Sequence, residues 1–180
     1  MTSMLCLAGG IASGKTTVAR GVHEAVPGSC VVSFGDVVRQ RIADLGLPPE
    51  RASLQRVGEQ LISAGWPTFV AALVRDVDLG SSLLIVDGVR HIEATEALRA
   101  AVPEARQVLI FVAVEPTVQR QRLAMRGESP ESLTHPMEQN LDWVRAQADL
   151  VVAGDRPVRE ALPQILRLLG LDVHTTGYEA

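Results

Sequence analysis

Short apolar runs alternate along the chain with longer segments in which apolar residues recur every three or four positions. The runs are residues 4–8, 30–34, 83–86, 108–114 and 150–152. Apolar runs of this length, separated by helical segments, are typical of buried strands in a parallel sheet with helices on both faces. We therefore predict one α/β domain over residues 1–180, with three layers and a five-stranded parallel sheet.

The longest connection in this pattern, residues 36–78, joins the second and third runs. Its apolar spacing and its breaks predict three helices. They span about 36–45, 51–63 and 67–77. Three more helices are predicted after the fourth and fifth runs, at about 116–127, 135–148 and 155–169.

A glycine-rich segment, Gly9 to Thr17, follows the first run and fits the pattern G-x-x-x-x-G-K-[ST]. Backbone N–H groups in such a loop turn toward an anion, and the next helix adds the partial positive charge of its N-terminus. Lys15, the only lysine of the chain, would reach the terminal phosphates, and Thr16 would ligate magnesium. The residues predicted to bind the nucleotide are Gly10, Ile11, Ala12, Ser13, Gly14, Lys15, Thr16 and Thr17.

Charged residues also follow the later runs. Asp36 and Arg39 follow the second run, and Asp87 and Arg90 follow the third. Ligands of open α/β sheets bind beyond the carboxyl ends of the strands, so we expect these side chains to converge. A carboxylate at the end of a strand, such as Asp87, assists magnesium in phosphate-loop enzymes. Alternatively, Asp87 has only a structural role, in a turn or as a cap at the end of the strand.

Composition narrows the classes of partner. The chain is 47% apolar but only 3% aromatic, and its net charge is −4. An acidic chain argues against a nucleic-acid or anionic-membrane surface as the main partner. No apolar run is long enough to span a bilayer, so we expect a cytoplasmic protein. We also expect it to be a monomer or homodimer that acts on a small molecule. Cys6 and Cys30 adjoin apolar strand residues and are expected to be buried and reduced.

These motifs resemble those of the nucleoside-monophosphate-kinase-like branch of the P-loop kinases. Residues 33–39, S-F-G-D-V-V-R, are similar to the S-T-G-D-x-x-R segment of adenylate kinases. Residues 86–90, V-D-G-V-R, are similar to their D-G-F-P-R segment but one residue shorter. Dephospho-CoA-kinase-like and deoxynucleoside-monophosphate-kinase-like proteins similarly carry D-G-[IV]-R and a segment like residues 54–59, L-Q-R-V-G-E.

On the donor side, the resemblance implies a P-loop NTPase fold that binds ATP, with Mg²⁺ held through Thr16 and Asp87. Lys15 would act in catalysis together with two arginines of the helix after the fourth run, Arg122 and Arg126. These arginines are four residues apart and therefore share one helix face. By the same resemblance, residues 127–136 would form a short lid over the transferring phosphoryl group.

On the acceptor side, the resemblance implies that residues 36–78 bind a small phosphate-bearing acceptor, with a (deoxy)nucleoside monophosphate as the first candidate. Arg39 and Arg90 would hold its phosphate, because a guanidinium matches phosphate oxygens in a bidentate way. The side chains expected to form the wall of this acceptor site are Ser53, Gln55, Arg56 and Trp66. For Trp66, packing beside Pro67 is favoured slightly over stacking on a base.

Asp36 leaves two reactions open. If the acceptor is a phosphate, its oxygen is already nucleophilic, and Asp36 would orient the substrate or cap the next helix. If the acceptor is a hydroxyl, as in dephospho-CoA kinase, Asp36 would be the general base. A third alternative is a nucleotide-dependent regulatory NTPase. The GTPase signature N-K-x-D is excluded, because Lys15 is the only lysine.

Overall fold

A computed structural model describes residues 3–78, 80–129 and 141–171. Its centre is a parallel sheet in which the strands are ordered β2-β3-β1-β4-β5. The strands are β1 (Ser3–Ala8), β2 (Cys30–Ser33), β3 (Leu83–Val89), β4 (Arg106–Ala113) and β5 (Leu150–Ala153). The five-stranded parallel sheet predicted from the apolar runs is confirmed.

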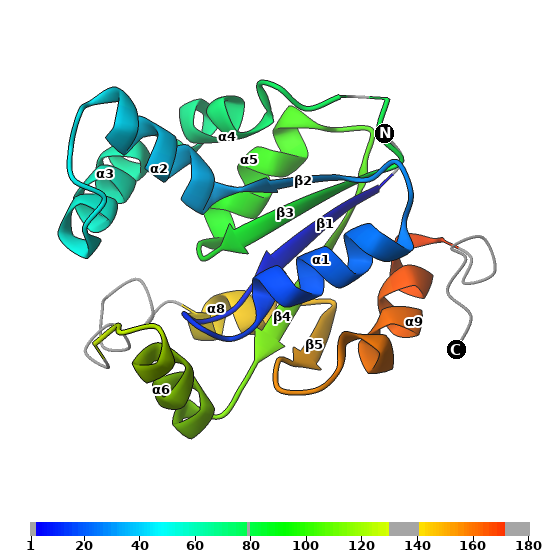
Figure 1. The fold of residues 1–180 in the computed structure, drawn as a ribbon. Helices are drawn as coiled ribbons and strands as arrows, with labels where there is room; N and C mark the ends of the chain where they lie inside the picture. Colours follow the sequence, from blue (N-terminus) through cyan, green and yellow to red (C-terminus); the bar gives the residue numbers. More distant parts are fainter. Residues whose placement is uncertain (1–2, 79, 130–140, 172–180) are drawn as a thin grey trace.

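Helices form the two outer layers (Figure 1). On one face lie α1 (Lys15–Ala25) and α9 (Val158–Leu169). On the other face lie α2 (Phe34–Asp44), α4 (Trp66–Val74), α5 (Ile92–Ala101) and α8 (Leu141–Ala146). Two helices, α3 (Arg51–Ser63) and α6 (Pro116–Met125), project beyond the carboxyl ends of the strands instead of covering the sheet (Figure 1).

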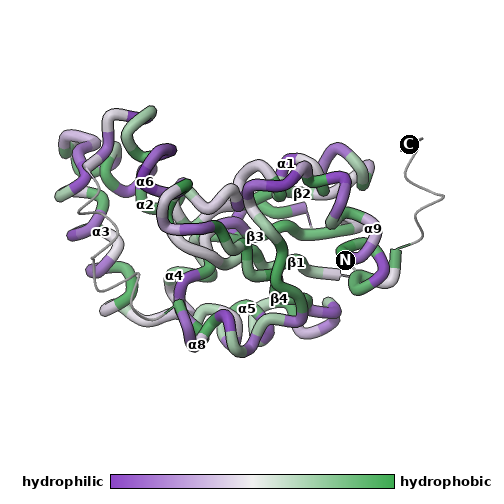
Figure 2. Tube along the Cα trace, turned by 90° about the horizontal axis from the view of Figure 1, so that it is seen from below, coloured by the Kyte–Doolittle hydropathy of each residue, from purple (hydrophilic) through white to green (hydrophobic). Residues whose placement is uncertain are grey.

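The central strand β1 is buried throughout and divides its side chains between two cores. Met4, Cys6 and Ala8 pack toward α4 and α5, whereas Leu5 and Leu7 pack toward α1 and α9. This alternation is the two-residue period of a strand, and it explains why the run is apolar at every position. In Figure 2 the central strands β1, β3 and β4 are accordingly coloured as hydrophobic.

The two cysteines are free but differ in burial. Cys6 is fully buried, and this burial raises the pKa of its thiol to about 12. Cys30, on the edge strand β2, is half-buried. Cys6 is therefore the buried structural residue expected from the sequence, and Cys30 is more exposed than expected.

Helix boundaries agree with the predictions in part. The helix predicted at 51–63 is α3, with the same bounds. α2 begins at Phe34 because the Ser33 hydroxyl accepts a hydrogen bond from the N–H of Gly35 at 3.1 Å. The capping role considered for Asp36 is therefore wrong. α4 is shorter than predicted, and α9 begins only after Pro157.

The helix predicted at 135–148 is described only from residue 141 onward, as α8. Residues 135–140 lie outside the described part of the chain. None of the helices in the described ranges combines the length and the apolar character needed to cross a membrane.

Candidate functional site

The glycine-rich loop joins the end of β1 to the start of α1, in the strand–loop–helix context that its motif requires. Gly14 has a φ of 105° and directly precedes the first residue of α1. The Lys15 ammonium folds back over the loop and donates to the carbonyls of Gly9 at 2.8 Å and Gly10 at 2.7 Å. The loop thus surrounds a cation at the N-terminus of a helix, which is the arrangement that attracts phosphate groups.

Thr16 and Asp87 meet at this loop, although they are 71 positions apart in sequence. The Thr16 hydroxyl donates to Oδ2 of Asp87 at 2.8 Å. Asp87 lies in β3, paired with Leu7 of β1 and Ser33 of β2, and only 7% of it is exposed. Its other oxygen, Oδ1, is buried without a hydrogen-bond partner in the described structure.

This pair of oxygen donors fits magnesium, which prefers hydroxyl, carboxylate, phosphate and water oxygens. A buried carboxylate oxygen without a partner is unfavourable unless a cation or a donor approaches it. No group of three or more His, Cys, Asp or Glu side chains that could hold a metal occurs within residues 3–78, 80–129 and 141–171.

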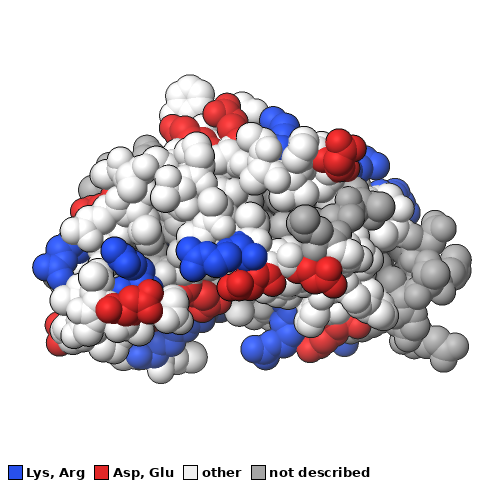
Figure 3. All heavy atoms as spheres, turned by 90° about the horizontal axis from the view of Figure 1, so that it is seen from above, with Lys and Arg blue, Asp and Glu red and all other residues white. Residues whose placement is uncertain are grey.

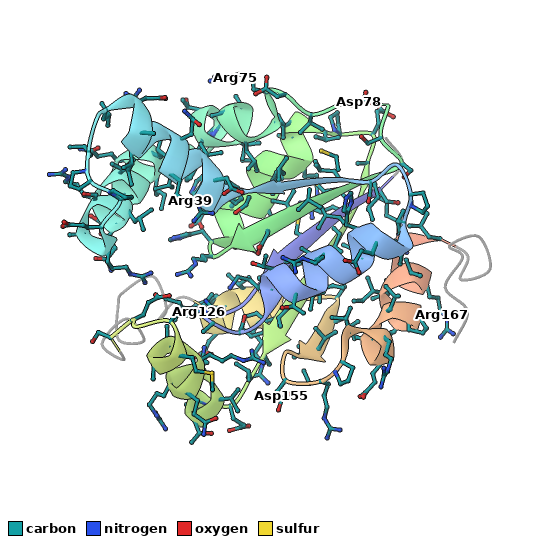
Figure 4. All side chains as sticks on the ribbon, in the orientation of Figure 1. Arg39, Arg75, Asp78, Arg126, Asp155 and Arg167 are labelled. Atoms are coloured by element: carbon teal, nitrogen blue, oxygen red, sulfur yellow. The ribbon has the colours of Figure 1, made fainter. Side chains whose placement is uncertain are left out.

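A cleft of about 370 Å³ opens in front of the loop, between the β3 end and helices α2 to α4. The predicted nucleotide-binding residues from Ile11 to Thr17 all line it. Among its described lining residues are five cationic side chains and one acidic side chain, Asp87. The cations are Lys15, Arg39, Arg51, Arg90 and Arg126. Figure 4 shows Arg39, from α2, and Arg126, at the end of α6, on opposite sides of this region.

This concentration of positive charge contrasts with the chain as a whole, whose net charge is −4. On the face seen in Figure 3, basic and acidic side chains are intermixed. Cations that line a concave, partly desolvated site raise the local concentration of anions. The cleft is therefore suited to bind anionic groups.

Aromatic side chains form another part of the cleft wall. Trp66 stacks on Phe69 with ring centroids 5.9 Å apart, and Phe34 meets Phe69 edge-on at 4.9 Å. All three rings line the cleft. Trp66 thus both packs and faces the cleft, so the two roles considered from the sequence are compatible. Gly58 of α3 adds open space, because a methyl group there would meet only Val38, at 3.9 Å.

Arg56, expected in the acceptor wall, lies on the other side of α3. The residues of α3 that line the cleft recur at helical spacing: Arg51, Leu54, Gln55, Gly58 and Ile62. Arg56 is off this face and lines a separate hollow with Arg41 and Leu45. Ser53 is buried, whereas Gln55 lies in the cleft as expected.

Arg51 is the cation that sequence reasoning missed on this helix. Its position one turn before Gln55 could have indicated it. The Arg51 guanidinium also lies 3.8 Å from the carboxylate of Glu128, just beyond α6. This ion pair joins the helical insertion to the end of α6 across the cleft.

Asp36 and Arg39 form an ion pair within the first turns of α2. Nη2 of Arg39 lies 2.6 Å from Oδ1 of Asp36, and Nε lies 3.2 Å from the same oxygen. The Asp36 side chain is 71% exposed and is not among the residues that line the cleft. The carboxylate considered as a general base is thus held by an arginine on its own helix.

The two arginines of α6 occupy different places. Arg126 lines the cleft, as predicted for a lid arginine. Arg122 instead donates to the carbonyl of Ala12 at 3.0 Å and to that of Gly154 at 2.8 Å. The predicted pair therefore does not face the cleft together. Residues 130–136 of the predicted lid lie outside the described part of the chain.

His91, for which the sequence suggested no role, follows Arg90 and lines the cleft. Its ring lies 5.2 Å from that of Trp66. Burial lowers its pKa below the ordinary histidine value, Glu93 acts in the opposite direction, and Arg90 lowers it further. His91 is therefore neutral at physiological pH and adds no charge to the cleft.

Together, the loop after the central strand, the carboxylate on the adjacent strand and the strand order define a P-loop kinase fold. A family model described as an AAA domain matches residues 8–136. The chain belongs to this family and, through its sequence relatives, to the UPF0200 proteins. This fold supports a nucleotide-dependent kinase or NTPase.

Two UPF0200 relatives illustrate the likeness. One, from Pyrobaculum aerophilum, is 34% identical over 74% of this chain and 72% of its own length. Another, from Methanosarcina barkeri, is 31% identical over 76% of both chains. Their names specify no acceptor.

Solved structures with the same fold include TT1252 from Thermus thermophilus, with a TM-score of 0.63 and 18% identity over 93% of this chain and 98% of that one. A sugar kinase from Janibacter has a TM-score of 0.61 and 19% identity over 99% of this chain and 100% of that one. A shikimate kinase from Acinetobacter baumannii has a TM-score of 0.56 and 16% identity over 99% of this chain and 97% of that one. At this identity these likenesses establish the fold alone.

Gly154, in the turn after β5, is a further site residue that was not among those predicted from the sequence. A Cβ there would lie 1.8 Å from the carbonyl oxygen of Ser13 in the loop. Because that neighbour is backbone, Gly154→Ala must displace the loop. We expect it to lower the stability by about 1–3 kcal/mol and the affinity for MgADP by about tenfold or more, measured by thermal unfolding and calorimetry.

The matched control is Gly58→Ala, which adds the same methyl group where the nearest atom is 3.9 Å away. The control should keep the wild-type affinity for MgADP. Unchanged affinity in Gly154→Ala would contradict the close contact between this turn and the loop.

Proposed function

We propose that this chain is a kinase that transfers the γ-phosphoryl group of ATP, with magnesium, to the phosphate of a (deoxy)nucleoside monophosphate. The observation that carries the proposal is the excess of cations in the cleft. Beyond Lys15 of the loop, it is lined by Arg39, Arg51, Arg90 and Arg126, and Asp87 is the acidic residue among its described lining residues. Arg39 and Arg51 also contact carboxylates outside the lining, those of Asp36 and Glu128, and the four arginines exceed these acidic groups in number. A second phosphate-bearing substrate would balance this charge.

The loop would bind the donor. Its N–H groups and Lys15 would hold the β- and γ-phosphates, and Thr16 and Asp87 would hold magnesium, which neutralises charge on these phosphates. Arg126 would neutralise the transferring group from the opposite side of the cleft. Catalysis would rest on positioning and on electrostatic stabilisation, which supply most of the acceleration in phosphoryl transfer.

The acceptor would occupy the side of the cleft made by residues 36–78. Arg39 and Arg90 would bind its phosphate in a bidentate way, with Arg51 as a further cation. The base would lie against Phe34 and Trp66, and the missing side chain at Gly58 would leave room for it. Because a phosphate oxygen is already ionised, this reaction needs no general base.

The main alternative is a hydroxyl kinase in which Asp36 is the base. That reaction would require Asp36 to leave Arg39, with which it forms the 2.6 Å contact, and to enter the cleft. Because the pair is exposed and worth about 0–1 kcal/mol, it disfavours this rearrangement only slightly. A regulatory NTPase would need no acceptor site, so the arginines on the far side of the cleft argue against it.

An acceptor screen tests the proposal. With ATP and magnesium, at least one nucleoside monophosphate should yield its diphosphate together with ADP, while the nucleoside with the same base should yield nothing. Lys15→Ala should reduce turnover by about a hundredfold or more. Turnover only with dephospho-CoA or an alcohol would favour the hydroxyl kinase. ATP hydrolysis that is indifferent to every acceptor would favour the regulatory NTPase.

Asp36→Asn separates the two kinase reactions. With a phosphate acceptor, kcat should stay within about tenfold of wild type and the acceptor KM should rise, because Arg39 loses its ionic partner. A general base would instead cost about 10²–10⁴ in kcat. The control, Asp44→Asn, removes another carboxylate of α2, one that is exposed and bonded to Gln40, and should change neither constant.

A further inference from the structure

The carbonyl groups of the loop are held one after another by side chains. Lys15 bonds to those of Gly9 and Gly10 from within the loop. The next two are held from α6. Gln119 donates to the carbonyl of Ile11 at 3.0 Å, and Arg122 donates to that of Ala12 at 3.0 Å.

One face of α6 makes the contacts to Ile11 and Ala12. Gln119 and Arg122 are three residues apart, so they lie on the same side of the helix. Leu123, on the same side of α6, is fully buried in a small apolar cluster with Ile11 and Ala12. Arg120 is exposed and makes none of these contacts.

Ala12 needs this support because of its backbone conformation. Its φ is 57°, and it is the only residue other than glycine with a positive φ in the described ranges. Residues with a Cβ disfavour this left-handed conformation and keep it only where surrounding contacts fix it. A left-handed residue within a turn also directs neighbouring N–H groups to one side, where they can bind an anion.

We propose that Gln119 and Arg122 are positioning residues that hold the carbonyls of Ile11 and Ala12 away from the cleft, so that the loop presents its N–H groups to the nucleotide phosphates. The inference rests on the proposed use of this loop as the donor site. Arg122 also fixes the loop from a second direction, because its Nη2 donates to the Gly154 carbonyl at 2.8 Å. One guanidinium thus joins the loop, α6 and the turn after β5.

This role differs from that of an arginine that contacts the transferring phosphoryl group. A positioning residue prepares the loop before the reaction, so its loss weakens the binding of any nucleotide that carries the β-phosphate. An arginine that acts only in the transition state changes kcat and leaves ground-state nucleotide affinity unchanged. The two roles therefore separate in a binding measurement without an acceptor.

The experiment compares Arg122→Ala, Gln119→Ala and Arg120→Ala by calorimetric titration with MgADP in the absence of acceptor. Arg122→Ala should weaken MgADP binding by about tenfold or more, because two hydrogen bonds from a charged group are lost. Gln119→Ala should weaken it by about threefold to tenfold. Arg120→Ala, which removes the same charge from an exposed residue of α6 that makes none of these hydrogen bonds, should bind as the wild type does.

Arg122→Lys provides a second comparison. A single ammonium lacks the planar fork that reaches the Ala12 and Gly154 carbonyls together, so it should restore only part of the affinity. The midpoint of thermal unfolding is measured for every variant. A residue that merely supports the fold would lower this midpoint and leave the MgADP dissociation constant of the folded protein unchanged.

Two results for the variants would overturn the inference. One is a lower kcat in Arg122→Ala with unchanged MgADP affinity, which would place Arg122 on the transferring group. The other is MgADP affinity in Arg122→Ala and Gln119→Ala equal to that of Arg120→Ala. If the wild type binds MgADP but phosphorylates no nucleoside monophosphate, the proposed acceptor fails while the affinities still decide the role of Gln119 and Arg122. If the wild type binds no MgADP, the donor site itself is wrong, and this inference with it.

Discussion

The loop after β1 has to turn successive N–H groups toward one anion, and this requirement organises the surrounding structure. When the N–H groups point inward, the carbonyls need partners on the other side of the backbone. Lys15 supplies two partners, and Gln119 and Arg122 of α6 supply two more. The turn at Gly154 packs directly against the Ser13 carbonyl, which is possible only without a side chain. The donor site therefore depends on residues from three separate stretches of the chain.

The same sheet edge carries the second half of the cleft. Asp87 reaches Thr16 because β3 is the immediate neighbour of β1, so the two carboxyl ends lie side by side. The connection between β2 and β3 is long enough to fold into three helices, and these bring arginines and aromatic rings to the cleft. A cleft with cations on both sides suits two phosphate groups that must approach each other against their mutual repulsion.

Much of this arrangement could be predicted from the sequence, because it rests on local patterns. The apolar runs predicted all five strands, and the helical spacing predicted α3 within its observed bounds. The loop motif predicted the placement of Lys15 and Thr16, and the strand ends predicted that Asp87, Arg39 and Arg90 converge on one cleft.

The remaining features depend on contacts that no local pattern records. Arg56 was expected in the cleft, but Arg51 lines it instead. Which side of α3 faces the cleft depends on how the helix packs against the rest of the structure. Arg122 bonds to a carbonyl 110 positions away, so its partner could not be inferred from its neighbours on α6. Asp36 looked available as a base, yet Arg39 on the next turn holds it.

The most direct test of the central claim, that one cleft binds a nucleotide and a phosphate-bearing acceptor together, is an affinity measurement. Compounds that join adenosine through a pentaphosphate to a second nucleoside span both halves, and adenosine 5′-pentaphosphate is the control that lacks the second nucleoside. We expect one of the joined compounds to bind about 100-fold more tightly than this control, because its second half binds at high effective concentration. Equal affinity for the control and for every joined compound would contradict the claim.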